Sequence, residues 1–530
     1  MVMNIETNTP EQLPRRKLLF PLEPLYDSRR FALTFTAIYF AVLLFFGLTF
    51  HKVGNFEVES DFYWEYAVQA RDFLLGKVII DPYHGPLYPW ILGLFSKIFG
   101  DLFKTGIVIS ALSASLSLFL IFGILKSVFS SDVAFVSTIL VAVNKSFVQY
   151  SYTAGTDMFF VAVSLAGLFM LFRKPVITVL ELCLSAACMS LAYLVRYNGF
   201  VFLLIIPLVI LLRSIQVKGL TKYSAVVIWV MVFIAFAAPW SIYLKLNCGS
   251  FFYNKNYQNI AYEVFAKGGI SWERFWFLFA NKFTSYSDVI LKAPLLFLVT
   301  VSTNAITHLV SDAVLLNNTS IGVLSILGGL LFSISHPDRR KTGLILTYLS
   351  FFLVLLPVFY WERFSLFLVP MYAVFFTILF KTLLSKSGGR RGATILLDSI
   401  FIIVLVISYA DSYSFNSKNI SSGPNEVLAI RDWFQKQYGH EYDNARILTR
   451  TSQIAYYLDM QCYPFPMIDD YGSLLTLMKR DSVKFLYYGI FEATTRPKFL
   501  GLFRLDTIHA GLKPLCYSRT PAAVLYEVTN

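Results

Sequence analysis

The chain has 530 residues, of which 56% are hydrophobic and only 15% are charged, and its formal net charge is +12. Soluble domains usually carry about 25% charged residues, so this composition excludes an ordinary soluble globular protein. Many of the basic residues stand in short connections between apolar runs, where they set membrane topology, so the positive charge does not indicate nucleic-acid binding.

The chain begins with a segment, residues 1–30, that we predict to be cytoplasmic. The apolar run Phe31 to Phe50 follows it and has no small-residue cleavage site, which favours a retained membrane anchor over a cleaved signal peptide. Basic residues precede this anchor, as expected on the cytoplasmic side: Arg15, Arg16, Lys17, Arg29 and Arg30.

Residues 31–411 predict an all-α polytopic membrane module of about eleven transmembrane helices, each near the length that a bilayer requires. With a cytoplasmic N-terminus, the inner loops hold basic clusters such as "DRRK" and "SKSGGRR", and the outer links are nearly free of them. The predicted spans are 31–50, 105–125, 132–148, 157–172, 177–195, 199–213, 223–243, 319–335, 342–360, 364–380 and 393–410.

Two apolar segments do not fit this pattern of spans. Residues 85–100 are too short to cross a bilayer and begin with prolines, so we expect a helix lying along the surface. In residues 295–316, Asn304, His308 and Asp312 recur every fourth residue, which favours an amphipathic or re-entrant helix at the outer face over a twelfth span.

Residues 412–530 have the composition of a soluble domain, which the number of spans places outside the membrane. Residues 424–439 and 471–481 are predicted helices, and "ARILTR", "VKFLYYGIF" and "AVLYEV" are predicted strands, so the domain is α/β. The five cysteines have no metal-ligand spacing, and the sequence leaves open whether Cys462 and Cys516 pair in this exported domain.

Several unusual polar residues fall on the outer side in this topology, many of them in or near a large first external loop, residues 51–104. Ionisable groups at membrane depth are costly and are functional candidates. Acids and arginines gathered at one face suit a substrate that carries a phosphate and must lose a proton. The candidates are Glu59, Asp61, Tyr63, His84, Asp157, Arg196, Glu362 and Arg363.

Each candidate also has a plainer interpretation. Asp61 and Asp157 could cap helices, and Arg196 and Arg363 could be interfacial anchors that extend to lipid headgroups. His84 precedes Gly85-Pro86 and could serve a turn, and the aromatic residues near Asp61 could form a membrane belt, Tyr63 among them.

The order of these motifs resembles the GT-C glycosyltransferases, in particular the bacterial branch related to protein O-mannosyltransferases and lipid A aminoarabinose transferases. The stretches that carry the resemblance are "ESDFYWEYAVQARDFLLGK", "HGPLYPWILGLFSKIFGD", Thr156-Asp157, "LAYLVRYNGFVFLL" and "ERFSLFLVP", and the tail resembles the external domain of many members. The chain departs from the family where Tyr197 and Asn198 replace a usual pair and Phe364 replaces a tyrosine.

The resemblance implies an inverting glycosyltransferase of the bacterial cytoplasmic membrane that takes a sugar from a polyprenyl phosphate. Asp61 would deprotonate the acceptor hydroxyl, with Glu59 as the alternate base, and Arg363 and Arg196 would hold the donor phosphate. The remaining candidates would orient substrates: His84, Asp157, Glu362 and Tyr63.

The partners implied are the lipid-linked sugar, membrane lipids and an acceptor that could be a lipid, a glycan or a protein. No cofactor is certain, and a divalent cation stays open because no ligand cluster is evident in the sequence. Two other functions compete, a flippase for a lipid-linked glycan and a non-catalytic membrane subunit. The absence of a visible internal repeat disfavours the flippase.

Overall fold

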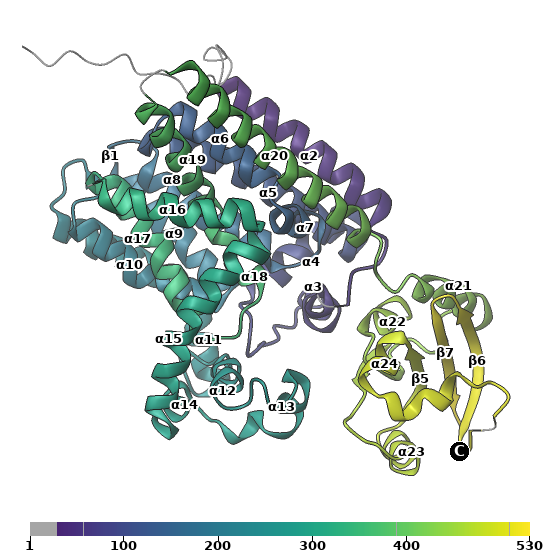
Figure 1. The fold of residues 1–530 in the computed structure, drawn as a ribbon. Helices are drawn as coiled ribbons and strands as arrows, with labels where there is room; N and C mark the ends of the chain where they lie inside the picture. Colours follow the sequence, from purple (N-terminus) through teal and green to yellow (C-terminus); the bar gives the residue numbers. More distant parts are fainter. Residues whose placement is uncertain (1–28, 57, 336, 388–389, 508, 530) are drawn as a thin grey trace, which may run out of the picture.

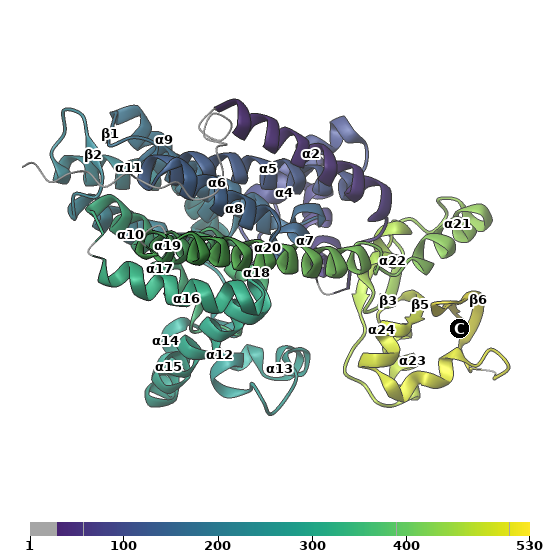
Figure 2. The ribbon, with the colours of Figure 1, turned by 45° about the horizontal axis from the view of Figure 1, so that its top comes forward.

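The structure is a computed structural model that describes residues 29–530, apart from residues 57, 336, 388–389 and 508 and the terminal residue. Nearly all of the predicted cytoplasmic segment, residues 1–30, lies outside the described residues. The chain forms a helical module, from which helices α12 to α15 project, and a C-terminal domain that lies beside it (Figures 1 and 2).

Helices cover the predicted spans, and further helices lie between them. They are α2 (Arg29–Phe50), η1 (Phe62–Tyr66), α3 (Ala67–Leu74), α4 (Leu87–Phe99), α5 (Leu102–Val128), α6 (Ser131–Ala142), α7 (Lys145–Tyr152), α8 (Thr156–Phe172), α9 (Val179–Val195), η2 (Tyr197–Phe200), α10 (Val201–Leu211), α11 (Lys222–Cys248), α12 (Tyr257–Phe265), α13 (Trp272–Leu278), η3 (Ala280–Lys282), α14 (Tyr286–Lys292), α15 (Pro294–Ser311), η4 (Asp312–Leu316), α16 (Thr319–Ile334), α17 (Arg339–Leu355), α18 (Glu362–Ser365), η5 (Leu366–Leu368), α19 (Val369–Lys386) and α20 (Arg391–Asn419).

Six helices in the described part of the chain are long and apolar enough to cross a membrane, so the protein is a multi-pass membrane protein. Five shorter apolar helices accompany them, among them α8, α9 and α16. The predicted span 132–148 is instead a pair of helices, α6 and α7, bent by 63°. The bend has a local cause, because the side chain of Asn144 accepts a hydrogen bond from Phe147 N and caps α7.

The interior of the module is built around α5, which packs against α8 and, through small residues, against the segment that leads into α8. A Cβ on Gly106 would lie 2.6 Å from the Cβ of Ala154, so only glycine allows this approach. The hydroxyls of Ser115 and Ser117 donate to carbonyls one turn earlier at 2.9 and 2.7 Å, which satisfies them in the apolar interior.

The two segments set apart from the spans form helices. Residues 87–99 form α4, a helix too short to cross a bilayer that buries Tyr88, Leu92 and Ser96. That it lies along the membrane surface stays a prediction. In α15 and η4 the polar stripe is present, but Asn304, His308 and Asp312 are buried in the protein, and the helix exposes apolar residues. This segment is also long and apolar enough to span a membrane. Because its polar residues are buried, the stripe faces the rest of the protein and not the surroundings.

The C-terminal domain is α/β, as predicted. A five-stranded sheet has the order β4 (Gln461–Pro464), β3 (Arg446–Thr449), β5 (Val483–Gly489), β7 (Ala522–Val528) and β6 (Leu512–Arg519). Strand β3 runs parallel to β4 and β5, and β7 runs antiparallel to β5 and β6. Its helices are α21 (Glu426–Tyr438), α22 (Ser452–Tyr457), α23 (Tyr471–Arg480), α24 (Ile490–Thr495) and η6 (Pro497–Phe503).

The sheet order settles the pairing of Cys462 and Cys516. Cys462 is on β4 and Cys516 is on β6, the two opposite edge strands. Four strand spacings of about 4.8 Å separate these edges, whereas a disulfide needs Cα atoms within about 7 Å. Both cysteines are free, and a disulfide between them is excluded by the fold.

The C-terminal domain docks on the first external loop through helix α22. Gln453 Nε2 donates to Gly54 O at 3.0 Å, and Tyr457 donates to Lys52 O at 3.1 Å. Farther along, Glu273 at the start of α13 pairs with Arg450 and Arg496 of the domain, each at 2.9 Å. The domain therefore holds both the first loop and the projecting helices.

Candidate functional site

Four of the predicted residues form one ion-pair network at the end of the module that carries the first external loop. Arg363 Nη1 lies 2.7 Å from Asp61 Oδ2, and Arg363 Nη2 lies 3.2 Å from Asp157 Oδ2. Arg196 pairs with the other oxygen of Asp157. The formal charges of two arginines and two aspartates cancel.

The network joins segments that are far apart in the sequence because each residue stands where a helix begins or ends. Asp61 immediately precedes η1, Asp157 is in the first turn of α8, and Arg196 follows the last residue of α9. Arg363 is in α18, the four-residue helix between α17 and α19. Helix ends meet at one face of a bundle, which places the four side chains together.

The plainer interpretations of these four residues do not match their contacts. Asp61 makes no side-chain capping hydrogen bond, and the N-cap of α8 is Gly155 instead of Asp157. The side chains of Arg196 and Arg363 are 10% and 3% exposed, so they do not extend toward lipid headgroups. The Asp61 side chain is the most open of the four, at 31%.

Glu59 is placed differently from Asp61. It is fully buried and accepts hydrogen bonds from His51 Nε2 at 2.7 Å, from Asn55 N at 2.9 Å and from Ala154 N at 2.5 Å. These contacts tie the first loop to the chain that leads into α8. Glu59 is therefore engaged on both carboxylate oxygens within the protein, whereas Asp61 has an open side.

Replacement of Glu59 by glutamine should destabilise the protein without removing its activity. The amide cannot accept all the hydrogen bonds of the carboxylate, and a buried unsatisfied donor costs on the order of 2 kcal/mol. We expect a lower melting temperature in detergent, with activity per folded molecule retained. A melting temperature equal to that of the wild type would show that these contacts do not support the loop.

Tyr63 and Glu362 are not members of the network. Tyr63 is 2% exposed, accepts from Gly54 N at 2.9 Å and packs on Phe103 and Tyr456, so its surroundings are protein and not a lipid belt. Glu362 is half-buried beside Arg363 and has no ion-pair partner among the described residues.

A second polar cluster, which the sequence analysis missed except for His84, lies in the first external loop. His84 Nδ1 is 2.9 Å from Glu65 Oε2 and 3.6 Å from Asp81 Oδ2, and Gln69 donates to Asp81 at 2.9 Å. Gly85 keeps the loop close to α9, because a Cβ there would lie 1.9 Å from Leu194 O. Glu65 is four residues after Asp61, and this spacing is the signal that could have revealed it.

The cluster has the donor set of a divalent-cation site. One ligand atom from each of Glu65, Asp81 and His84 lies within 4.8 Å of the others. Two carboxylates and an imidazole are ligands that zinc accepts. The His84 Nδ1 atom would have to give up its proton, so cation affinity at this cluster should rise with pH.

The same contacts predict how pH changes stability. Burial lowers the pKa of His84, but Glu65 and Asp81 outweigh it and raise this pKa from 6.5 to about 10. A raised histidine pKa stabilises the fold fully below pH 6.5 and loses that contribution as the pH rises toward 10. We expect the free energy of unfolding to fall by about 1 kcal/mol across this pH window, which lowers the melting temperature. The melting temperature of His84→Gln should fall less over the same window. Equal slopes would contradict the prediction.

A third group of polar residues was also missed. Asp312, in the π-helical turn η4, is fully buried and accepts from Tyr360 at 2.9 Å and from Tyr372 at 2.8 Å. These bonds hold η4 against the segment that leads to α18. They fix the backbone that carries Arg363, so we assign this group a positioning role.

The network around Arg363 combines a buried cation with a carboxylate open to solvent. A guanidinium held by carboxylates is a ready partner for a phosphate, because it binds either anion with paired N–H groups. A carboxylate with an open side can accept a proton from a hydroxyl. The group that could bind a phosphate, Arg363, and the group that could deprotonate a nucleophile, Asp61, are therefore in direct contact.

Residues 83–243 match the model of the dolichyl-phosphate-mannose-protein mannosyltransferase family. This segment contains three of the site residues: His84, Asp157 and Arg196. A sequence search among curated proteins finds no match.

Solved structures share the fold. The oligosaccharyltransferase AglB from Archaeoglobus fulgidus, in complex with an inhibitory peptide and a dolichol-phosphate, has a TM-score of 0.57 at 12% identity, over 94% of this chain and 75% of that chain. ArnT from Cupriavidus metallidurans, bound to undecaprenyl phosphate, has a TM-score of 0.57 at 12% identity, over 93% and 97%. An A. fulgidus oligosaccharyltransferase complex with zinc and sulfate matches equally well, over 93% and 73%. The predicted GT-C-like fold is confirmed.

Proposed function

We propose that this chain, a membrane glycosyltransferase of the GT-C superfamily, moves a sugar from a polyprenyl-phosphate donor to an acceptor hydroxyl. The observation that carries the proposal is the Arg363 bridge between Asp61, which is partly open, and Asp157, which is buried. The structural neighbours bound to a dolichol-phosphate and to undecaprenyl phosphate support a lipid-phosphate donor.

The donor phosphate would bind at Arg363 by taking the position of the Asp61 carboxylate. All three guanidinium nitrogens of Arg363 are engaged by carboxylates, so an anion that binds this residue competes with one of them. Asp61 is the more exposed of the two carboxylates on Arg363, and Asp157 stays held by Arg196. Donor binding would thereby free Asp61 from its ion pair beside the reacting sugar.

Asp61 would then act as the general base. The acceptor oxygen forms a bond to the anomeric carbon, its proton passes to the Asp61 carboxylate, and the bond from that carbon to the phosphate oxygen breaks. Polyprenyl phosphate leaves with the bonding electrons, and Arg363 balances the negative charge that develops on it. Attack opposite the leaving group inverts the anomeric centre.

The other site residues would have supporting roles. Arg196 would assist with the phosphate, and Asp157 would hold both arginines in place. His84 and Glu362 would orient the donor head or the acceptor. Tyr63 would act through the first loop, since its hydroxyl is engaged with Gly54 N.

The membrane face and the acceptor belong to the same proposal. Basic residues such as Arg213 and Arg339 lie at the opposite end of the module from Arg363. By the positive-inside rule, this supports a site at the outer face of the bacterial cytoplasmic membrane, with the N-terminus inside. The C-terminal domain packs against the first loop next to this site. It would help to receive an acceptor, a lipid, a glycan or a protein, from outside.

A divalent cation would be held by Glu65, Asp81 and His84 and would keep the first loop folded near Asp61. Titration of the purified protein with Zn²⁺ at pH 8 should show a single bound ion, and His84→Gln should lose it. Undiminished zinc binding by His84→Gln would place the cation elsewhere.

The proposed activity is tested by incubating the purified protein with a panel of polyprenyl-phosphate sugars. We expect one of them to be consumed, with release of polyprenyl phosphate, and this consumption should disappear in Asp61→Asn. Movement of an intact lipid-linked glycan across proteoliposomes, with no cleavage of any donor, would point to a flippase and overturn the proposal.

A further inference from the structure

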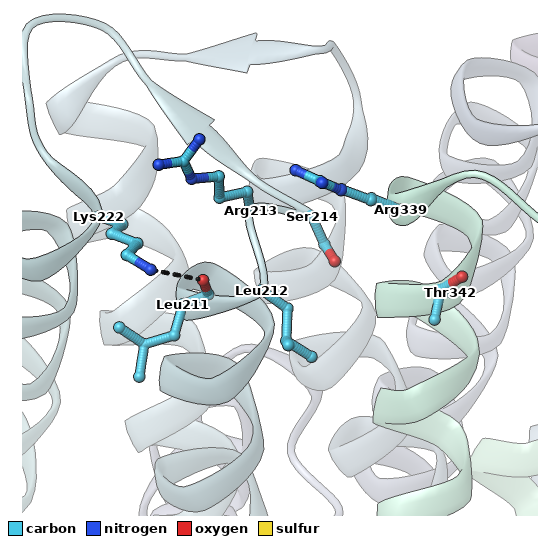
Figure 3. Close-up of a pocket in the computed structure, with 7 residues that line it drawn as sticks. All are labelled: Leu211, Leu212, Arg213, Ser214, Lys222, Arg339 and Thr342. Carbon is cyan, nitrogen blue, oxygen red and sulfur yellow. Dashed lines mark hydrogen bonds between the residues drawn. The ribbon is translucent and has the colours of Figure 1, made fainter.

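The structure contains a cavity of about 510 Å³ outside the Asp61–Arg363 network, and Figure 3 shows the residues that line it. It lies where α10 ends and where α11 and α17 begin. Its described lining contains three basic side chains, two hydroxyls and no acid: Leu211, Leu212, Arg213, Ser214, Lys222, Arg339 and Thr342.

The helices themselves show that the cavity and the catalytic network are at opposite ends. Arg196 precedes η2 and α10, and Arg213 follows them, which separates the two residues by roughly 20–25 Å. Helix α17 repeats the relation, since Arg339 begins it and Arg363 follows its far end. This separation approaches the thickness of a bilayer's hydrocarbon core, about 30 Å. The cavity therefore lies at the level of the headgroups of the other leaflet.

The charges in the cavity lack a counter-ion. Arg213 and Arg339 both line the cavity, and the Arg339 side chain extends toward the segment that carries Arg213 (Figure 3). Neither arginine forms an ion pair with any described residue. Asp338, the nearest acid in sequence, caps α17 and pairs with Lys341 at 2.7 Å. Like charges gathered around one cavity repel one another, and an anion bound among them would relieve this repulsion. The first turns of α11 and α17 add the positive ends of two helix dipoles.

A buried hydroxyl provides a second, independent sign of a ligand. Ser214 is only 4% exposed, lines the cavity, and its hydroxyl makes no hydrogen bond to any part of the chain that the structure describes. Gly343 on α17 makes room for it, since a Cβ there would lie 2.7 Å from Ser214 Oγ. A phosphate oxygen in the cavity would accept a hydrogen bond from this hydroxyl.

An apolar stripe on α10 runs into the cavity. Leu204, Leu208 and Leu212 recur every fourth residue, so they share one face of the helix, and they are 62%, 46% and 47% exposed. Leu212 also lines the cavity. A ligand with a charged phosphate head and an acyl chain would match the basic cavity and the stripe at the same time.

We propose that this cavity binds the phosphate of an anionic phospholipid, with an acyl chain along the leucine stripe of α10. The phosphate would lie between Arg213 and Arg339, accept a hydrogen bond from Ser214 and be balanced by Lys222. Such a lipid would tie the loop after α10 to the start of α17. The site is separate from the proposed transferase chemistry and does not depend on it.

The test is native mass spectrometry of the full-length protein released from nanodiscs with equal amounts of phosphatidylglycerol and phosphatidylcholine. The wild type should retain phosphatidylglycerol in preference to phosphatidylcholine. In R213A/R339A the ratio of retained phosphatidylglycerol to phosphatidylcholine should fall by about 10-fold. Ser214→Val keeps the charges, and its ratio of retained phosphatidylglycerol to phosphatidylcholine should fall only a few-fold. The control is Lys218→Ala, an exposed lysine of the same loop outside the cavity, and it should behave as wild type.

Melting temperatures complete the experiment. Phosphatidylglycerol should raise the melting temperature of the wild type and of Lys218→Ala. It should not raise the melting temperature of a folded R213A/R339A protein. Equal retention of both lipids by the wild type, or an unchanged preference in both R213A/R339A and Ser214→Val, would overturn the proposal. Stabilisation by inorganic phosphate alone, without a lipid preference, would assign the cavity to a soluble anion and overturn the lipid.

Discussion

Replacement of Asp61 by asparagine should lower sugar transfer by about 10²- to 10⁴-fold while the protein stays folded and inserted. Loss of a general base has an effect of this size, because the acceptor hydroxyl then attacks without transferring its proton. Asparagine keeps the shape of Asp61 and can still contact Arg363, so donor binding should change far less than turnover. The measurement is the release of polyprenyl phosphate from the active donor, with donor affinity determined separately.

Glu59→Gln is the matched control for this variant, because it neutralises a carboxylate two residues away. Glu59 is buried and Asp61 is open, so the first change should affect stability and the second should affect turnover. If Asp61→Asn transferred sugar at the wild-type rate and folded Glu59→Gln did not, the base would be Glu59.

Replacement of Arg363 by alanine should weaken binding of the donor about 10- to 100-fold, which is the worth of a hydrogen-bonded charge pair. It also leaves Asp61 without its partner and Asp157 with Arg196 alone. We therefore expect a loss of stability as well, of about 3 kcal/mol, because carboxylates near the membrane interior keep their charge without compensation. Donor affinity is measured with an analogue of the polyprenyl-phosphate sugar whose sugar–phosphate bond cannot be cleaved. Stability is measured by thermal unfolding in detergent.

Arg196→Ala separates the two effects of Arg363. Arg196 contacts Asp157 but not Asp61, so its loss should lower stability and affect donor affinity less than the loss of Arg363. The double variant Asp61→Asn with Arg363→Ala removes the orphaned carboxylate and should recover stability without recovering affinity. Unchanged affinity in Arg363→Ala would remove this residue from the phosphate site.

The sequence located the helices well because a bilayer demands long apolar runs, and such runs are visible without tertiary information. It failed where a run contains a local interruption. Residues 132–148 are apolar throughout most of their length, yet Asn144 starts a new helix and bends the pair by 63°. The polar stripe of α15 was recognised, but its direction was not, since a polar stripe can face water or the interior of a membrane protein.

The residues of the candidate site were predicted because the topology of the spans puts them all on the same side of the membrane. Asp61, Asp157, Arg196 and Arg363 all follow from placing the loops on one face, and they do form a network. The partners of His84 could not be found in this way, because Glu65 and Asp81 look like ordinary loop acids. Likewise, the choice between Glu59 and Asp61 depends on burial, and residues two positions apart have nearly the same sequence context.

What the sequence alone determined was the class of protein, the approximate helices, the gathering of the candidate residues at one face of the module and the α/β nature of the C-terminal domain. These depend on composition and periodicity, which local stretches of the chain contain in full. Only the tertiary structure decided which carboxylate is open, which acids surround His84, that Cys462 and Cys516 are on opposite edges of the sheet, and that Arg213 and Arg339 share a cavity. Each of these is a distance between segments far apart in the chain, set by how the helices and strands pack.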